Sequence, residues 1–510
     1  MELLEVILLL LLCAVALGWV ARRLHFPYPI ALVLGGGALG FVPKLPQFPF
    51  DPQLILVLVL PPILYQAALL TSWRDFKANI RAIGLLAIGL VIVTTLVVGA
   101  TAKLLAPELP WGAAFALGAI VSPPDAVAAT AILSRLNIPR RVVSVLEGES
   151  LVNDASGLVL YKFAVAAVLT GTFSLLDASL EFAGLALGGI AIGVVLALVF
   201  VAIHRHLGDA FIEVLMTLSV PYVAYVLAEY LHTSGVLAVV AAGLVRGRYS
   251  PEIVSAEMRI LARSMWNVLV FLLNSLIFIV IGMQLSGIVG RLAGFSATEL
   301  FAQATLISMV AILVRFAWIY PATYLAAVLG APERERPPEP EVFIMSWCGM
   351  RGIVSLAAAL ALPESFPGRD LIIFLTFAVI AVTLVLQGLT LGPLIRRLKV
   401  GDDWSAHEEH HRASNALANA AIAAIDALAR KESIPEALAE RIRAEFAEKV
   451  TLGLRDGPVL NRGAELPRRL RLEAIRAERQ ALIRIWRENQ IGDEVLHQLE
   501  ESLDYQEQRL

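Results

Sequence analysis

A proline pair followed by an acidic side chain interrupts a long apolar run, in the sequence Ser122-Pro-Pro-Asp125. Proline has no N–H to donate, so Pro123 and Pro124 free the carbonyl oxygens four residues before them. Such carbonyls can coordinate a cation where a membrane helix breaks around a cavity. Asp125 would then lie at the positive N-terminal end of the second half-helix, which favours its ionised form. A proline kink with a capping aspartate explains the same residues equally well.

A second polar group opens the next apolar run. Helical spacing stacks Glu149 on Asn153 and Ser150 on Asp154, one turn apart. An ionisable side chain at mid-membrane costs roughly 2.5–3.5 kcal/mol on insertion scales, so each one is a candidate functional residue. Asp154 must be paired, hydrated or protonated at that depth. A purely structural role is the weaker explanation for it.

Two glycines flank a cation in the run Gly349-Met-Arg351-Gly, where a helix is expected to be irregular. Arg315 is a second cation inside an apolar run. The simplest interpretation is that each arginine neutralises a buried carboxylate, which is compatible with a functional role.

The composition says which kind of structure must position these residues. Of 510 residues, 58% are hydrophobic and 17% are charged, and the mean hydropathy is +0.74. Soluble domains carry about 25% charged residues, so this chain has too little polar surface to be one. The net charge of −3 gives no basic footprint for nucleic acid, and Cys13 and Cys348 lie in apolar runs as reduced packing residues.

The sequence predicts an all-α polytopic membrane protein, because a helix of about 20 apolar residues crosses a bilayer core roughly 30 Å thick. We expect about thirteen transmembrane segments. They are 3–20, 28–43, 53–71, 80–106, 112–136, 142–170, 179–203, 210–231, 235–246, 262–288, 297–330, 342–362 and 370–395.

Charge divides the chain and orients it. Residues 1–400 hold 48 charged side chains, whereas residues 401–510 hold 37. We therefore expect a transmembrane domain over 1–400 and a helical cytoplasmic domain over 401–510. Alternate loops carry 18 basic residues on one side and 4 on the other. By the positive-inside rule, this places the N-terminus outside and the tail in the cytoplasm. The acidic start of the first segment, with no cleavage site after it, predicts a retained helix rather than a signal peptide.

One motif in the tail suggests different chemistry. The run His407-Glu-Glu-His-His411 matches H-E-x-x-H, which on a helix could hold zinc through His407 and His411. A membrane-anchored zinc metalloprotease is therefore an alternative function. A polar start to a juxtamembrane helix is the better explanation, because the sequence places no third ligand. Cytoplasmic pH sensing by these histidines is a further hypothesis.

Taken together, the polar motifs resemble a known family. The runs at 122–125 and 148–154, with Leu60-Pro-Pro-Ile63 and Gly349-Met-Arg-Gly352, are similar to those of bacterial monovalent cation:proton antiporters of the NhaP type, the sodium/proton exchangers. The resemblance covers about residues 1–400. It implies thirteen helices in two inverted repeats, with helices five and twelve broken and crossing near the midplane. It also implies a homodimer, surrounded by lipid in the bacterial cytoplasmic membrane.

The resemblance also implies roles for single residues. The cation-binding and proton-binding carboxylate corresponds to Asp154, with Asn153 beside it and Asp125 opposite. The stabilising ion pair corresponds to Glu149 with Arg351, and with Arg315 as a further partner. Ser150 is a plausible extra ligand.

Two positions depart from the pattern of many members. Pro124 replaces a threonine, so Ser122 or a freed carbonyl would have to supply the missing ligand. Gln66 replaces an acid. Ion preference therefore cannot be carried over from the family to this chain.

Charge counting gives a mechanism. Asp154 holds one proton or one monovalent cation, and Asn153 is neutral, which predicts electroneutral 1:1 exchange with no cofactor. We expect Na⁺ as substrate, with Li⁺ and K⁺ as alternatives, in pH and sodium homeostasis. A passive cation channel is an alternative function, and it would show no proton flux coupled to the cation flux.

Overall fold

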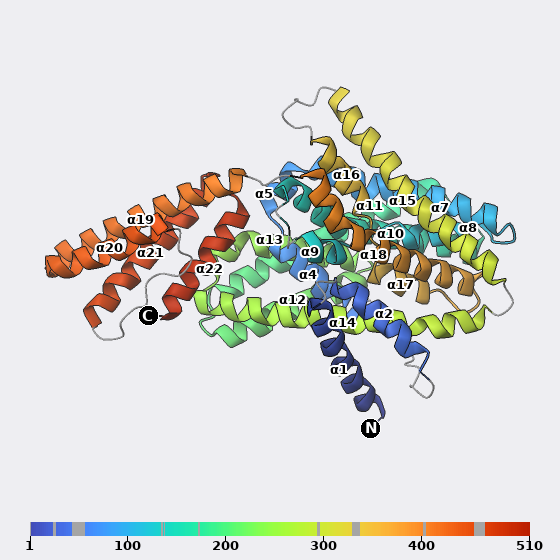
Figure 1. The fold of residues 1–510 in the computed structure, drawn as a ribbon, viewed down its shortest axis with the longest axis horizontal. Coiled ribbons are helices and arrows are strands. Elements are labelled where there is room, and N and C mark those ends of the chain that lie inside the picture. The colour runs from blue at the N-terminus through green and yellow to red at the C-terminus, as the bar shows by residue number, and fades with distance from the viewer. Residues whose placement is uncertain are drawn as a thin grey trace.

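The computed structural model describes residues 2–23, 27–42, 57–133, 136, 138–171, 174–292, 296–328, 337–400, 404–452 and 465–509. Within those ranges the secondary structure is helical, without a strand. Figure 1 shows a broad body built from α1–α18, with an arm of α19–α22 extending from one end. We call these two parts the body and the tail.

Among the described residues, the first half of the body contains ten helical elements. They are α1 (Glu2–Arg23), α2 (Tyr28–Gly40), α4 (Leu60–Leu70), α5 (Trp73–Ala78), α6 (Ile80–Gly84), the π-helix η1 (Leu85–Leu90), α7 (Val91–Leu105), α8 (Trp111–Val121), α9 (Ala126–Leu133) and α10 (Arg140–Thr170).

The second half of the body and the tail complete the chain. The body continues with α11 (Leu175–His204), α12 (Ala210–Tyr230), α13 (Gly235–Ile253), α14 (Ala256–Arg291), α15 (Ala297–Val328), α16 (Glu339–Trp347), α17 (Ile353–Leu360) and α18 (Arg369–Leu398). The tail contains α19 (Trp404–Glu432), α20 (Glu436–Leu452), α21 (Glu465–Arg487) and α22 (Asp493–Arg509).

The body is that of a multi-pass membrane protein. Seven helical runs among the described residues are long and apolar enough to cross a bilayer, and α2, α4 and α8 are shorter apolar helices. Every predicted segment overlaps a helix or an interrupted pair, although residues 43, 53–56, 134–135 and 329–330 of those segments lie outside the described residues. The all-helical, membrane-spanning class is therefore confirmed, and the number of crossings stays a prediction.

Two helices of the body are interrupted where the sequence predicts it. The first break separates α8 from α9 at residues 122–125, and the second separates α16 from α17 at residues 348–352. Prolines cause the first, because they cannot donate the helical hydrogen bond. Glycines flank the second, where extended backbone replaces helix (Gly352 φ −146°, ψ −143°).

Most buried apolar side chains of the described body belong to two large clusters. One surrounds both breaks and draws on α2, α8, α14 and α18, and the other joins α4 to α11–α13. Small residues let the helices approach closely, as where Gly36 of α2 lies against the backbone of Ile279 in α14. Helix α10 contributes to the second cluster and also contacts α8 and α9, so it links the clusters to the first break.

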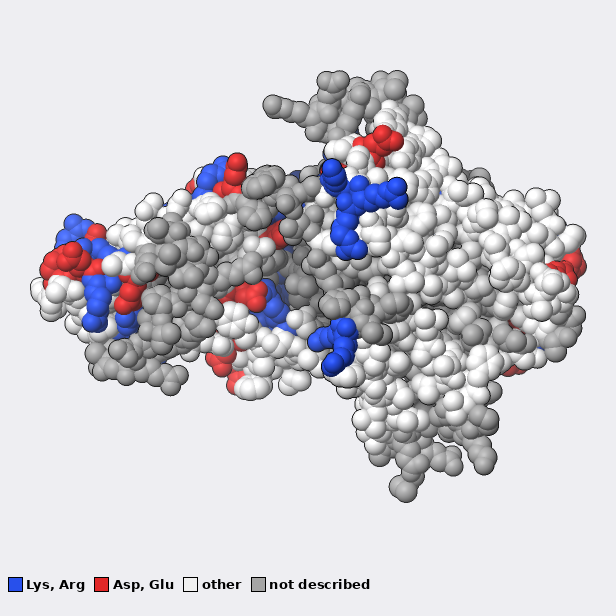
Figure 2. Space-filling view, in the orientation of Figure 1, with Lys and Arg blue, Asp and Glu red and all other residues white. Residues whose placement is uncertain are grey.

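The tail has an apolar core of its own, built from all four of its helices. It meets the body through polar contacts, such as the ion pair between Arg259 of α14 and Asp504 of α22 (2.7 Å). In the view of Figure 2, most charged side chains gather on the tail and on the adjoining end of the body, while the rest of the body is largely uncharged.

Candidate cation and proton site

The two helix breaks meet inside the body. The backbone N–H of Asp125 donates a hydrogen bond of 2.7 Å to the carbonyl oxygen of Met350. The N–H of Arg351 donates to the hydroxyl of Thr383 on α18 (3.1 Å). Non-helical backbone in a membrane needs such partners, because lipid supplies none. The place where the two breaks meet is therefore held by two hydrogen bonds. One joins the first break to the second, and the other joins the second break to α18.

The second break approaches Asp125 so closely that only glycine fits. A Cβ added to Gly352 would overlap the Asp125 side chain, including its Cβ and its carboxylate. The glycine in the predicted Gly-Met-Arg-Gly run thus provides space rather than backbone freedom.

Helix α10 brings the predicted Asn-Asp pair to the first break. The Nδ2 of Asn153 donates to the carbonyl oxygen of Pro124 (3.1 Å), and the Asn153 side chain is fully buried. Its Oδ1 has no hydrogen-bond partner among the described residues. Gly157, one turn later, lets the helix lie against the ring of Pro123. The break and the Asn-Asp pair therefore form one site.

Asp154 also lies at this site, and its carboxylate has no protein partner among the described residues. Its residue is 6% exposed, and its carboxylate makes no hydrogen bond or ion pair within the part of the chain that the structure describes. Asp125 is half-buried at the first break, where α10 brings its Asn-Asp pair. Two carboxylates in one buried region favour binding of a positive charge.

The two predicted serine ligands lie at the edge of this group. Ser122 is fully buried, but its hydroxyl donates to the carbonyl of Ala119 (2.9 Å). That carbonyl is one of the two that the prolines free, and it already accepts this hydrogen bond. Ser150 is half-buried on α10, one turn before Asp154.

The buried ion pair differs from the expected one. Both carboxylate oxygens of Glu149 accept hydrogen bonds from Arg315 of α15, with 2.7 Å between Nη2 and Oε2, and both residues are 1% exposed. The Nε of Arg315 also donates to the carbonyl of Met345 (3.0 Å). Arg315 is thus the principal partner and Arg351 is not, because a fork of two N–H groups from the facing helix already occupies both oxygens.

Arg351 is left as a buried cation near the crossing. It is 1% exposed, and its Nε and Nη1 have no hydrogen-bond partner among the described residues. Within the described part of the chain, the Arg351 backbone is held by its hydrogen bond to Thr383.

Sequence reasoning did not single out the polar residues of α18. Gln387 is 1% exposed with both amide atoms unpartnered in the described structure, and it lies one turn beyond Thr383 on the same helix. The signal was available, since two polar side chains four residues apart in an apolar segment share one helix face.

The H-E-x-x-H run shows no metal site in what the structure describes. It lies on α19, where the His407 side chain is outside the described residues and His411 is exposed. No cluster of three potential metal ligands occurs among the described side chains. Glu409 instead binds Arg140 of α10 (3.0 Å) and the N–H of Gly492 (3.1 Å), so this run helps to hold the tail on the body.

Comparison with known proteins decides the family. The family model described as sodium/hydrogen exchanger, transmembrane, matches residues 7–397. The chain belongs to the sodium/hydrogen exchanger family. The resemblance to bacterial NhaP-type antiporters is confirmed, and the chain is a cation:proton antiporter rather than an enzyme. The protease and channel alternatives find no support.

Relatives of this sodium/hydrogen exchanger cover most of its length. An uncharacterised Na⁺/H⁺ exchanger of Mycobacterium tuberculosis is 34% identical over 99% of this chain and 96% of its own. The sodium, potassium, lithium and rubidium/H⁺ antiporter of Bacillus pumilus is 32% identical over 98% of this chain and 77% of its own. The sodium proton antiporter MjNhaP1 of Methanocaldococcus jannaschii shares the fold, with a TM-score of 0.63 and 21% identity over 79% of this chain and all of its own.

Proposed function

We propose that this exchanger carries one monovalent cation against one proton by competition for Asp154. The observation that carries the proposal is the buried, uncommitted carboxylate of Asp154 at the meeting point of both helix breaks. Because Asn153 is neutral, Asp154 changes partner while the rest of the site keeps its charge. One positive charge moves in each direction, so the exchange is electroneutral.

The neighbouring residues define the site around Asp154. Asn153 binds the Pro124 carbonyl through Nδ2 and leaves its Oδ1 available as a ligand. Asp125 adds negative charge, which strengthens binding of a cation or a proton alike. Ser122 and Ser150 are the proposed additional oxygen ligands. Glu149 and Arg315 hold α10 to α15 and do not exchange ions.

The proposed substrate is Na⁺, with Li⁺ and K⁺ as alternatives, and the proton is the counter-substrate. Support comes from the names of the relatives. The antiporter of Halobacillus dabanensis is named for Na⁺, and that of Bacillus pumilus is named for several alkali cations. No organic cofactor is needed, because a carboxylate alone performs the exchange. The physiological role would be pH and sodium homeostasis.

The proposed assembly has thirteen crossings in two inverted repeats, with the N-terminus outside. Residues 1–400 form the transport domain, and residues 401–510 form a helical cytoplasmic domain. The 18 to 4 distribution of basic residues supports this orientation. We place the protein in the bacterial cytoplasmic membrane as a homodimer, in keeping with the fold it shares with MjNhaP1.

The test is transport by Asp154→Asn in proteoliposomes loaded with a pH-sensitive dye. We expect the variant to fold, as judged by size-exclusion chromatography, and to give no dye response to a Na⁺ pulse. Asp370→Asn is the matched control, because Asp370 is 44% exposed at the start of α18 and should leave transport intact. Robust exchange by Asp154→Asn would remove the central claim. A rate that changes with an imposed membrane potential would contradict electroneutrality.

A further inference from the structure

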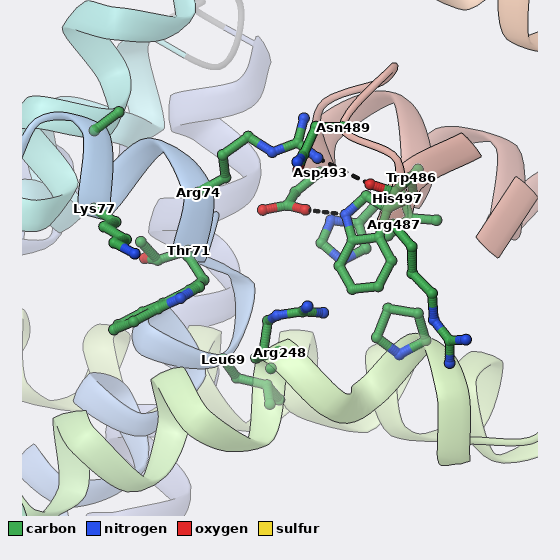
Figure 3. A pocket seen from close by; sticks show the side chains of 15 residues that line it. Leu69, Thr71, Arg74, Lys77, Arg248, Trp486, Arg487, Asn489, Asp493 and His497 are labelled. Atoms are coloured by element: carbon green, nitrogen blue, oxygen red, sulfur yellow. Dashed lines mark hydrogen bonds between the residues drawn. The ribbon is translucent and has the colours of Figure 1, made fainter. Parts of the chain in front are cut away.

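A cavity separates the tail from the body on the side where the tail docks. Its volume is about 520 Å³. Body residues from α4, α5 and α13 line one wall, and the turn between α21 and α22 lines the other (Figure 3). Ligand pockets in proteins commonly measure about 300–1,000 Å³, so this one has room for a small molecule.

Most of the cations in the lining form no ion pair within the described part of the chain. Arg74, Lys77 and Arg248 lie on the body wall, and none of them has an ion-pair partner among the described residues. The tail adds Arg487, which is paired with Glu252 of α13 (2.8 Å). Three unpaired positive charges therefore face the cavity against the negative charge of Asp493, which leaves the lining net positive.

The cavity lining also contains an acidic residue, Asp493. The carboxylate of Asp493 accepts hydrogen bonds from the hydroxyl of Ser72 and from the indole N–H of Trp486, each 2.5 Å long. Asp493 therefore fastens the tail to the body. It keeps its negative charge, which offsets part but not all of the positive charge of the cavity lining.

Two of the cations are held in place by the tail itself. Arg74 donates to the backbone carbonyls of Ile491 (2.6 Å) and Trp486 (3.0 Å). Arg248 lies over the Trp486 ring, 4.5 Å from its centroid. Neither interaction removes positive charge. The side chain of Lys77 is exposed and makes no hydrogen bond in the described structure.

We propose that this cavity binds a phosphate-bearing anion that bridges the body and the tail. Arginine and lysine are the side chains that recognise phosphate oxygens, through charge-assisted hydrogen bonds. The phosphate could belong to a soluble ester or diphosphate, or to the headgroup of an anionic lipid. A ligand that contacts both walls stabilises the docked tail by mass action. The proposal is independent of Asp154, and its test measures binding rather than transport.

The experiment uses the purified full-length protein in neutral detergent and two kinds of probe. Pyrophosphate and ADP are titrated while the melting temperature is followed, and native mass spectrometry counts phosphatidylglycerol molecules retained from mixed micelles. The test variant is Lys77→Gln with Arg248→Gln. The matched control is Arg81→Gln, which removes an exposed cation of α6 that does not line the cavity.

Saturable stabilisation by pyrophosphate or ADP would support a soluble phosphate ligand, and retained phosphatidylglycerol alone would support a lipid headgroup. In either case we expect the double variant to weaken binding by about tenfold or more, since it removes two charged donors, and Arg81→Gln to leave it unchanged. Absence of binding by every probe would overturn the proposal. An equal loss in the double variant and in Arg81→Gln would also overturn it, because it would show general charge attraction.

Discussion

The amide nitrogen of Asp125 and the carbonyl oxygen of Met350 are joined by a hydrogen bond of 2.7 Å, which ties one broken helix to the other. Each of these groups lies where its own helix has ended. Unpaired, each would cost several kcal/mol in a membrane interior. The two breaks thus form a single structural unit, and a displacement of one break also displaces the other.

This closeness predicts that Gly352→Ala stops transport. The added Cβ would meet the Asp125 side chain near its base, where a change of rotamer cannot avoid the clash. The φ of −146° at Gly352 is within the range that L residues adopt, so we attribute the effect to displacement of Asp125. We expect exchange to fall by about tenfold or more, in line with the cost of misplacing a binding group by about 1 Å.

Proteoliposome transport at matched protein density measures this loss. Gly184→Ala is the control, because nothing lies within 4 Å of a Cβ added there in α11. Wild-type rates in Gly352→Ala would show that Asp125 can move without consequence.

The ion pair between Glu149 and Arg315 predicts a stability effect rather than a transport effect. Glu149→Gln leaves the Arg315 guanidinium buried without a counter-charge, and breaking a buried pair in this way costs about 3–5 kcal/mol. We expect a lower melting temperature in detergent and lower expression. The double variant Glu149→Gln, Arg315→Gln should recover part of the loss, since two amides can hydrogen-bond without a stranded charge.

The control for that measurement is Glu108→Gln, which removes an exposed carboxylate between α7 and α8. If Glu149→Gln melts like the wild type and is inactive, Glu149 belongs to the transport site and the structural role is wrong.

Local chemistry explains which parts of this site the sequence could predict. Prolines and glycines act on their own backbone, so the breaks at 122–125 and 348–352 follow from sequence alone. The partner of Glu149 does not, because Arg315 and Arg351 are both single cations in apolar surroundings. Only the packing of α15 beside α16, which directs Arg315 to Glu149, distinguishes them. Likewise, Arg74 binds backbone carbonyls in the tail, over 400 positions away. Every residue has a backbone carbonyl, so the sequence does not indicate which ones accept from Arg74.

Competition at Asp154 predicts how the exchanger responds to pH. A proton and a cation that exclude each other raise the apparent KM for Na⁺ as the pH falls, by up to about tenfold per unit when the carboxylate is mostly protonated. The maximal rate should stay nearly constant, because saturating Na⁺ displaces the proton. Initial rates at several Na⁺ concentrations, with equal pH on both sides of the vesicle, measure both quantities. A falling maximal rate at constant KM would indicate that the proton acts elsewhere.

His497 in the tail predicts a second pH effect, on stability rather than on ion binding. Burial lowers the pKa of His497 below its ordinary value of 6.5, Asp493 opposes this, and the positive charges of Arg263 and Arg259 lower it further. The folded tail therefore binds fewer protons than the unfolded one. The stability that neutral His497 provides is intact above about pH 6.5 and is lost as the pH falls from there toward the lower folded value.

We therefore expect limited proteolysis of the tail to accelerate as the pH falls from about 7.5 to about 5.5, and to accelerate less in His497→Gln. Burial also raises the pKa of the neighbouring Glu500, but that group is the same in both proteins and cancels in the comparison. His411→Gln is the control, because His411 is exposed on α19. An identical pH profile in His497→Gln and wild type would show that His497 titrates without affecting the fold, and the protection of the tail would then depend on other contacts, among them the ion pairs of Arg259 and Arg140.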